Sequence, residues 1–317
     1  MRTTTNERKH RGALGSALAA AGLAVELSIT GCTAGTNQAP STPDHTATAP
    51  TSPGGISQAA SATARVPTAG TERYIVVGSR HFAARCDGSG PAVILVADYG
   101  RSMDDTGPAL HNLTPNAQAC LYDRLGVGRS DSASRLQTFT SLADDLDGVS
   151  SGLKLTQPVV VLGDGFGAPI ALTWASRHAK DARAVVLINP DPPGFRGPRG
   201  ALARLLPPKD PGDVDLSNLW IDLDHFNDPA RNRESLDPRS WDAYLRLGSS
   251  STPLYDLIGL PSPTWPASVD AKKVNGAWQQ GQSRVLRLSS SSELLTVAHE
   301  ADWPAALTRT LQRAVQN

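Results

Sequence analysis

Short apolar runs alternate with segments of helical spacing along most of the chain after residue 70. The runs predict strands at 74–77, 92–97, 117–122, 159–162, 185–188, 252–258 and 294–298. Apolar positions at helical intervals predict helices at 136–155, 168–179, 278–288 and 303–315. Continuous apolar strands that alternate with helices favour a mainly parallel sheet with helices on both faces, so we expect an α/β fold.

The alternation stops between the strand that ends near Asn189 and the run that starts at Thr252. Residues 190–252 are dense in Pro, Gly, Asp and Arg, with Trp220 and Trp241 in short amphipathic pieces. Segments of such composition usually run over the surface of a fold. We therefore expect residues 190–252 to form a cap or lid inserted into a single domain of residues 71–317.

Residues 1–32 have the order of charge and apolarity that is typical of a secretory signal. Basic residues cluster between Arg2 and Arg11, and a small, apolar stretch follows at 12–30. The stretch ends in Ile-Thr-Gly before Cys32 and resembles a bacterial lipobox, whose cysteine becomes lipid-modified and N-terminal after cleavage. The resemblance implies an exported lipoprotein on the outer face of the bacterial cell membrane, anchored through Cys32. A plain cleaved signal and a disordered tail are the alternatives.

Residues 33–70 consist almost entirely of Thr, Ser, Ala, Pro and Gly. Such a segment buries too little apolar surface to offset the entropy of ordering, so we predict a disordered tether. If Cys32 carries lipid, Cys86 and Cys120 remain as an even pair in an oxidising compartment, where a disulfide is expected. The alternative is two buried free thiols.

Charge excludes one class of partner. Lys plus Arg and Asp plus Glu each number 30, so the formal net charge is zero. A nucleic-acid surface normally shows a basic excess. We therefore expect no nucleic-acid partner.

The segment Val159–Ala175 reads as strand, sharp turn and helix, with glycines at 163, 165 and 167. Two arrangements fit this spacing. The dinucleotide-binding loop G-x-G-x-x-G/A is matched by Gly163, Gly165 and Ala168. The nucleophile elbow G-x-S-x-G is matched at both outer glycines, but Gly165 stands where its serine should be.

Two further motifs favour the elbow. Residues 119–131, ACLYDRLGVGRSD, strongly resemble the signature Y-D-R-x-G-x-G-x-S-D of the α/β-hydrolase superfamily, and Val-Ala-His299 before Asp-Trp-Pro304 resembles its histidine loop. Together the similarities span residues 74–315. A dinucleotide loop would want an acidic residue at the end of the next strand, roughly 20 residues on, where this chain has the neutral Asn189. Nucleotide binding remains as a remote alternative.

The resemblance implies a role for each position of a hydrolase site. His299 would be the base that accepts a proton, while Gly165 leaves the nucleophile position without a side chain. The acid would follow the strand after the insertion, where Asp256 and Asp270 are candidates. The other place that the family uses follows the strand before the insertion, where Asn189 and Asp191 stand.

The oxyanion hole of such a site uses backbone N–H groups, which do not depend on side-chain identity. One would come from Phe166, after the nucleophile position. Another would come from the loop after the early buried strand, near Asp98-Tyr99-Gly100-Arg101, where Gly100 and Arg101 are the candidates. Some relatives use an aspartate nucleophile, but Asp164 stands one residue too early in the turn. Ser130 lacks the glycine that a tight strand-to-helix turn would need, and we expect it to order its own loop.

These residues predict a pseudo-hydrolase: an exported, lipid-anchored protein with a binding or accessory role that holds an ester, lipid or peptide-like small molecule under the cap. Gly165 in an otherwise preserved elbow motivates this hypothesis. The alternative is an active hydrolase of an ester or related bond that uses a non-standard nucleophile such as Asp164. We expect neither a cofactor nor a metal ion.

Overall fold

The computed structural model describes residues 70–110, 116–155, 157–224, 232–259 and 265–317. The predicted leader of residues 1–32, with Cys32, lies outside the described residues, as does the predicted tether except for Gly70. Within the described part, no helix combines the length and the apolarity that a membrane crossing requires.

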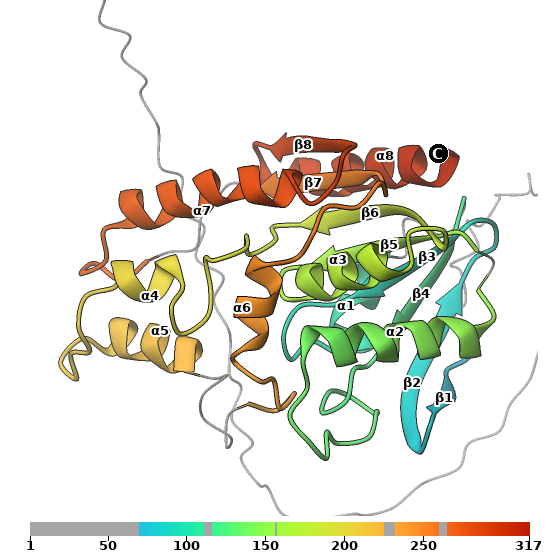
Figure 1. Cartoon of the computed structure of the whole chain (residues 1–317), viewed down its shortest axis with the longest axis horizontal. Helices are drawn as coiled ribbons and strands as arrows, with labels where there is room; N and C mark the ends of the chain where they lie inside the picture. Colours follow the sequence, from blue (N-terminus) through green and yellow to red (C-terminus); the bar gives the residue numbers. More distant parts are fainter. Residues whose placement is uncertain (1–69, 111–115, 156, 225–231, 260–264) are drawn as a thin grey trace, which may run out of the picture. The chain divides into compact units, whose positions relative to one another are not determined.

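An eight-stranded sheet with the order β1-β2-β4-β3-β5-β6-β7-β8 forms the centre of the fold (Figure 1). The strand β2 is antiparallel to its neighbours β1 and β4. From β4 through β3, β5, β6 and β7 to β8, each strand is parallel to the next one in the sheet. The strands are β1 (Arg73–Val77), β2 (Arg80–Asp87), β3 (Ala92–Val96), β4 (Gln118–Tyr122), β5 (Val159–Asp164), β6 (Ala182–Ile188), β7 (Leu254–Gly259) and β8 (Ser292–Val297). Each predicted strand is therefore present, and so is the mainly parallel sheet.

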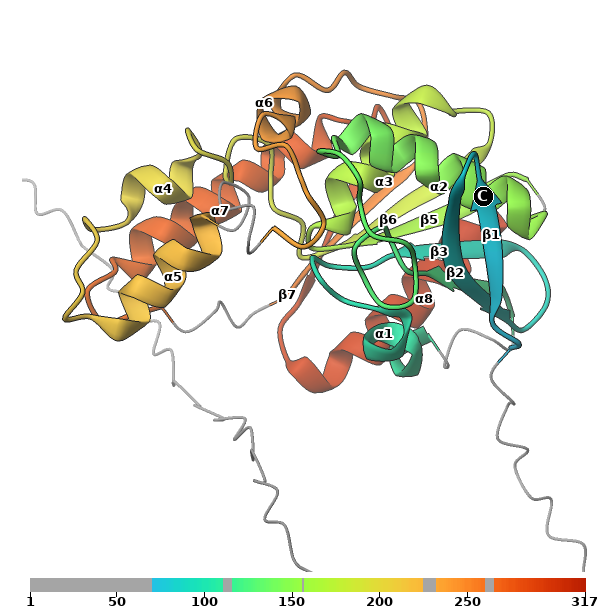
Figure 2. The ribbon, with the colours of Figure 1, turned by 90° about the horizontal axis from the view of Figure 1, so that it is seen from below.

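Helices cover both faces of the sheet because its central strands are apolar on both sides (Figure 2). All residues of β3 are buried. Two apolar clusters lie on opposite sides of the sheet. The first cluster packs the sheet against α2 (Phe139–Leu153) and α3 (Gly167–Arg177), and the second packs it against α1 (Met103–Leu110) and α8 (Trp303–Gln316).

Local chemistry fixes the ends of α2. The side chain of Thr138 accepts a hydrogen bond from the N–H of Ser141, and the Ser141 side chain accepts one from the N–H of Thr138, which forms a capping box. At the other end Lys154 takes a left-handed conformation with φ of 56°. Leu142, Leu146 and other residues at helical spacing place one face of α2 in the core.

The predicted disulfide is present. Cys86 on β2 and Cys120 on β4 are register partners in adjacent antiparallel strands, and their sulfurs are bonded. The bond closes a separation of 34 residues. A crosslink of this span restricts the unfolded chain and stabilises a domain by about 4 kcal/mol in the chain-entropy account.

The insert, defined here as residues 190–252, splits into two parts. The first carries α4 (Ala201–Leu205) and α5 (Val214–Asp224), which lie beside α7 (Ala271–Leu286) (Figures 1 and 2). This part has its own apolar cluster, with Leu202 and Leu216 fully buried. The second carries α6 (Ser240–Leu245), whose Trp241 and Tyr244 belong to the main core beside α2 and α3. The predicted cap or lid thus includes a helix that is part of the main core.

Sequence patterning misses two elements, β2 and α1. The strand β2 begins with Arg80-His81 and also holds Arg85 and Asp87, so it shows no continuous apolar run. The helix α1 contains Gly107-Pro108, residues of low helix propensity.

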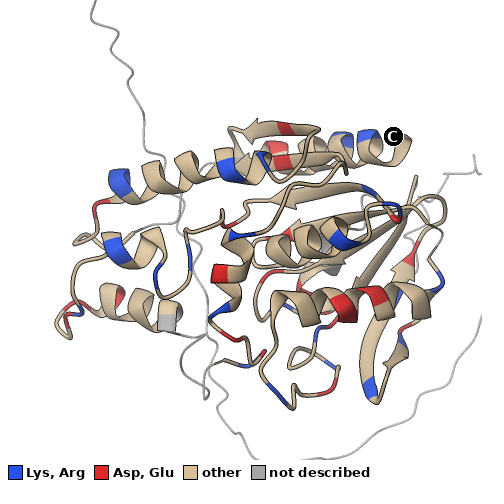
Figure 3. Ribbon diagram, viewed as in Figure 1, with Lys and Arg blue, Asp and Glu red and all other residues tan. Residues whose placement is uncertain are grey.

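Basic and acidic residues are interspersed along the described ribbon (Figure 3).

Candidate active site

The turn between β5 and α3 depends on its outer glycines. A Cβ on Gly163 would lie 2.8 Å from Cα of Ala168, and a Cβ on Gly167 would lie 1.9 Å from the carbonyl oxygen of Val96. Gly165 at the tip has a φ of +48°, a conformation that costs residues other than glycine energy. The strand and the helix can therefore approach this closely only without side chains at the outer positions.

Asp98, directly after β3 and Ala97, occupies the space in front of Gly165. Its Oδ1 accepts hydrogen bonds from the N–H of Phe166 at 2.7 Å and from the N–H of Tyr99 at 2.8 Å. A Cβ built on Gly165 would lie 2.5 Å from Oδ1 and 2.7 Å from Cγ of Asp98. The carboxylate thus sits where a side chain at the nucleophile position would begin.

Two backbone N–H groups that point at one oxygen form the geometry of an oxyanion hole. Here the N–H groups of Phe166 and Tyr99 both point at Oδ1 of Asp98. The N–H groups of Gly100 and Arg101, which we predicted for this role, have other acceptors: Gly100 donates to Oε1 of Glu234 at 2.8 Å and Arg101 to the Asp98 carbonyl at 3.2 Å. In this structure the hole is filled by the chain's own carboxylate.

A buried ion pair holds the Asp98 loop from behind. Arg124 binds both carboxylate oxygens of Glu234 at 2.7 Å, and it donates to the carbonyls of Ala97 at 2.6 Å and Asp98 at 2.9 Å. The side chains of Arg124 and Glu234 are 2% and 1% exposed. A buried pair of this kind is stable only while every partner is present. The arginine of the Y-D-R motif therefore positions the loop that supplies Asp98.

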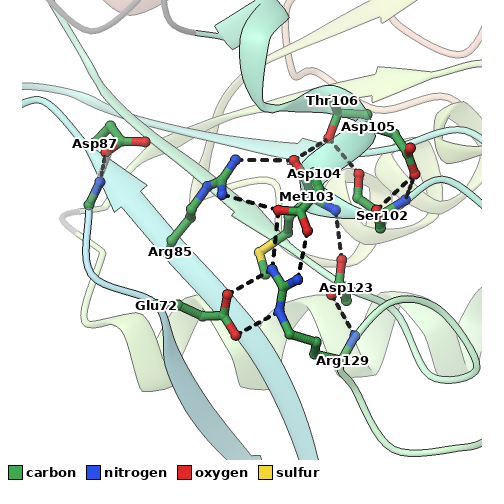
Figure 4. Close-up of polar contacts among 11 residues, drawn as sticks. Glu72, Arg85, Asp87, Ser102, Met103, Asp104, Asp105, Thr106, Asp123 and Arg129 are labelled. Atoms are coloured by element: carbon green, nitrogen blue, oxygen red, sulfur yellow. Dashed lines mark hydrogen bonds and ion pairs between the residues drawn. The ribbon is translucent and has the colours of Figure 1, made fainter. Parts of the chain in front are cut away.

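The rest of that motif fixes neighbouring backbone. Oδ1 of Asp123 accepts from the N–H of Met103 at 2.7 Å and Oδ2 from the N–H of Arg129 at 2.9 Å, while Arg129 forms ion pairs with Asp104 at 2.6 Å and with Glu72 (Figure 4). The Ser130 hydroxyl donates to the carbonyl of Asp123 at 2.6 Å. These contacts tie the loop after β4 to the start of α1, so Ser130 orders its loop rather than facing the elbow.

A cavity of about 220 Å³ lies at the carboxyl edge of the parallel strands, the usual ligand position in open α/β sheets. It is bounded by the elbow, by the ends of β6 and β7, by the insert and by α7. Its lining residues are Asp98, Gly165, Asn189, Asp191, Phe195, Arg196, Leu202, Gly259, Trp265, Asn275 and Trp278.

Neither predicted acid candidate lines this cavity. Asp256 stands in the middle of β7, is fully buried, and has no hydrogen-bond partner among the described residues for either carboxylate oxygen. Burial raises its pKa to about 7. Asp270 caps α7, where its side chain accepts from the N–H of Lys273 at 3.1 Å, and this bond lowers its pKa. Their contacts are those of a buried core residue and of a helix cap.

The residues after β6 do line the cavity. Asn189, with a φ of +43°, accepts a hydrogen bond at Oδ1 from the N–H of Gly259 at 2.7 Å and so ties the ends of β6 and β7 together. This amide stands where a dinucleotide site would need an acid for the ribose. Asp191 forms an ion pair with Arg196, and burial raises its pKa.

His299 and Asp164 lie away from the lining. His299 is exposed in the segment after β8, and no hydrogen bond or ion pair joins its ring to another described residue. Asp164 ends β5, and burial together with the charge of Asp98 raises its pKa to about 6. The structure therefore brings Gly165, Phe166 and Asp98 together, and His299 is not among the described residues that line the cavity beside them.

Sequence reasoning placed Asp98 and Tyr99 in the oxyanion loop and Arg124 in the Y-D-R motif. It missed the role of the Asp98 carboxylate and the contact of Arg124 with Glu234. A signal for the first was present, because an aspartate directly after a buried strand stands at the position that supplies oxyanion-hole N–H groups. No cluster of three or more His, Cys, Asp or Glu side chains among the described residues is arranged to hold a metal ion.

Comparisons with known proteins agree on the fold. A relative of 24% identity over 110 residues is the uncharacterized protein YqjL of Bacillus subtilis, and the match covers 35% of this chain and 44% of that protein, so this chain spans less than half of its length. Among solved structures, a 2-hydroxy-6-oxo-6-phenylhexa-2,4-dienoate hydrolase from Rhodococcus matches with a TM-score of 0.55 and 18% identity over 79% of this chain and 100% of its own. A haloalkane dehalogenase loop variant from Bradyrhizobium elkanii matches with a TM-score of 0.56 and 13% identity. The match covers 78% of this chain and 96% of the dehalogenase chain.

The family model for the alpha/beta hydrolase fold matches residues 91–288, which is more than half of the chain. This span contains the elbow, the Asp98 loop and the insert. The chain belongs to the α/β-hydrolase fold family.

Proposed function

We propose that this protein is a pseudo-hydrolase, which binds a small molecule in the 220 Å³ cavity and does not hydrolyse it. The observation that carries the proposal is the position of Asp98, whose Oδ1 takes both N–H donors of the oxyanion hole beside Gly165. Such a protein would keep the binding cavity of the hydrolase fold. It would lack two elements that hydrolysis needs, a nucleophilic side chain at residue 165 and an open oxyanion hole.

The size of the expected loss supports this function. Removing a triad member leaves only about 10³ to 10⁴-fold acceleration over water, and that remainder comes from the oxyanion hole and from binding. Here the hole is already filled, and loss of one oxyanion donor alone costs about 10² to 10³-fold in turnover. A negative carboxylate in the hole also repels the oxyanion that would develop on an ester carbonyl. Both contributions are therefore missing at the same place.

The test compares ester turnover and labelling. The full chain should hydrolyse p-nitrophenyl esters no faster than its His299→Ala variant, and a fluorophosphonate probe should not label it. Gly165→Ser should gain little, because the new Cβ would lie 2.5 Å from Asp98 Oδ1. The double variant Asp98→Ala/Gly165→Ser empties the hole, and we expect it to be labelled faster than Gly165→Ser.

The matched control is Asp144→Ala/Gly165→Ser, because Asp144 is an exposed carboxylate paired with Arg177 on the helical surface. It should behave like Gly165→Ser alone. Robust turnover by the unmodified chain that depends on His299 would overturn the proposal.

A second candidate, an active hydrolase with a carboxylate nucleophile, has one observation in its favour. Oδ2 of Asp98 forms no hydrogen bond with a described residue, and the carboxylate stands beside the nucleophile position. Intact-mass measurement after rapid quenching of an ester reaction separates the candidates. A covalent adduct mapped to Asp98 or Asp164 would favour this second candidate.

The proposal includes export and anchoring through Cys32, supported by the lipobox-like sequence before it. Two or more acyl chains hold a protein on a membrane far more firmly than one. Bacterial cells that express the full chain should incorporate labelled palmitate into it, and Cys32→Ala should abolish the incorporation. A soluble, unlabelled product from the unmodified chain would remove the anchor from the proposal.

A further inference from the structure

The charges that line the cavity do not balance. Among the described residues, the charged side chains of the lining are Asp98, Asp191 and Arg196, and Arg196 forms an ion pair with Asp191. Asp98 has no ion-pair partner among the described residues. Its Oδ1 is held by two backbone N–H groups, while Oδ2 has no hydrogen-bond partner among those residues. Among the described residues, Asp98 is thus the lining carboxylate that forms no ion pair, although the charge of Arg124 acts on it from behind the loop.

The nearby arginines are engaged elsewhere. Arg124 binds Glu234 through two hydrogen bonds and meets Asp98 only at its carbonyl oxygen. The side chain of Arg101 donates to the carbonyl of Asp105 at 3.2 Å. After burial, the charge of Asp98 is a further cause that raises the pKa of both Asp164 and Asp191. The field of Asp98 therefore reaches across this end of the site.

Three aromatic side chains line the cavity. Phe195 comes from the insert, Trp265 precedes α7, and Trp278 lies within it. The Trp265 indole N–H donates to Oδ1 of Asn275 at 2.8 Å, so its polar atom is already satisfied. Aromatic rings attract cations through their negative faces, and the attraction increases when water is excluded. The same cavity combines an uncompensated carboxylate with the side chains that favour an organic cation.

We propose that the ligand of this cavity is a small organic cation with an apolar part, such as an alkylammonium group, bound by Asp98 between the aromatic walls. The inference rests on the proposed binding function and specifies its ligand. A carboxylate or an ester oxyanion is disfavoured, because Asp98 Oδ1 already holds the N–H groups of Tyr99 and Phe166. The volume of about 220 Å³ favours a compact molecule.

Three probes of matched shape test the charge: choline, the neutral 3,3-dimethylbutanol and the anionic 3,3-dimethylbutanoate. Each is titrated into the full chain by calorimetry, with tryptophan fluorescence as a second signal. Choline should bind about tenfold or more tightly than the alcohol, as an ion pair plus a cation–π contact in a cavity predicts. Asp98→Asn should bring the two affinities together, and the control Asp144→Asn should change neither.

A second variant keeps the test independent of any misfolding of Asp98→Asn. Trp278→Leu retains an apolar wall but lacks the indole ring, so it should weaken choline binding and leave the alcohol nearly unaffected. Equal or tighter binding of the alcohol or the butanoate would overturn the inference. The absence of saturable choline binding at millimolar concentration would overturn it too. Failure of the proposed function would show instead as ester turnover or fluorophosphonate labelling.

Discussion

The turn after β5 and the segment after β8 differ in which features of the predicted hydrolase site they show. At the turn, the backbone geometry of an elbow is present. Gly163 and Gly167 pack closely against neighbouring backbone, Gly165 has a positive φ, and two backbone N–H groups converge on one oxygen. After β8, a suitable residue type is present, because the resemblance predicts His299 as the base. Its side chain is nevertheless exposed and does not line the cavity.

The difference shows which contacts preserve each region. Close packing of Gly163 and Gly167 against backbone atoms is part of the core, so the turn keeps its shape whatever stands at its tip. A catalytic histidine depends on a side-chain partner that orients it, and none of the described residues supplies one to His299. Binding geometry made of backbone can therefore outlast the side chains that perform chemistry.

The largest expected effect comes from the ion pair behind the turn. Glu234→Ala would leave Arg124 buried without its carboxylate and would free the N–H of Gly100. Breaking a buried pair in this way costs about 3–5 kcal/mol of unfolding free energy. Urea denaturation of the Glu234→Ala domain should show this loss.

The matched control is in the region of β8, where Arg313 of α8 and Glu293 of β8 form an exposed ion pair. Glu293→Ala should cost less than about 1 kcal/mol, since water screens exposed pairs. If the two substitutions cost the same, the Asp98 loop is not held by a buried network as we describe.

The same contrast explains what sequence can predict. The glycine spacing and the apolar runs depend on local requirements of backbone and burial, and they led to the strands, the mainly parallel sheet and the elbow. The disulfide follows instead from counting Cys86 and Cys120 as an even pair once Cys32 is set aside. The occupied oxyanion hole depends on contacts between distant segments, because Asp98 meets Phe166 68 residues away. Arg124 meets Glu234 110 residues away in an insert with no recognisable motif. Such contacts leave no periodic pattern.

The two predicted acid candidates, Asp256 and Asp270, do not line the cavity for a related reason. Asp256 lies on a strand, and only the pairing of β7 with β6 and β8 buries it in mid-sheet, away from the cavity. Asp270 is the residue type that commonly caps a helix, and the helix that we predicted from 278 in fact begins at Ala271. An earlier helix start would have marked Asp270 as a cap.

A smaller effect should follow from Asp256→Asn on the β7–β8 side. Burial raises the pKa of Asp256 to about 7, so the folded state binds a proton that the unfolded state releases near its ordinary value of 3.8. Unfolding free energy should therefore fall as pH rises from about 4 to about 7 and then level off. Between pH 4 and 8, the variant should gain roughly 2–4 kcal/mol relative to the unmodified protein.

For Asp270, the contribution to unfolding free energy changes with pH in the opposite direction, and Asp270→Asn tests this. The pKa of Asp270 is lowered, so this group contributes stability above its unfolded pKa and loses it as pH falls through the folded value. Thermal unfolding across the pH range measures both variants. Parallel pH profiles for Asp256→Asn and the unmodified protein would contradict an ionisable, unpartnered carboxyl in the core.

The smallest expected effect is that of His299→Ala. The side chain is exposed and has no hydrogen bond to a described residue, so its removal should change unfolding free energy by less than about 0.5 kcal/mol. It should also leave the slow background hydrolysis of p-nitrophenyl esters unchanged, because no proton transfer at Gly165 depends on it. A loss of tenfold or more in that hydrolysis, with stability unaffected, would show that the segment after β8 reaches the turn during a reaction. The two regions would then form one working site, and the comparison on which the pseudo-hydrolase proposal rests would fail.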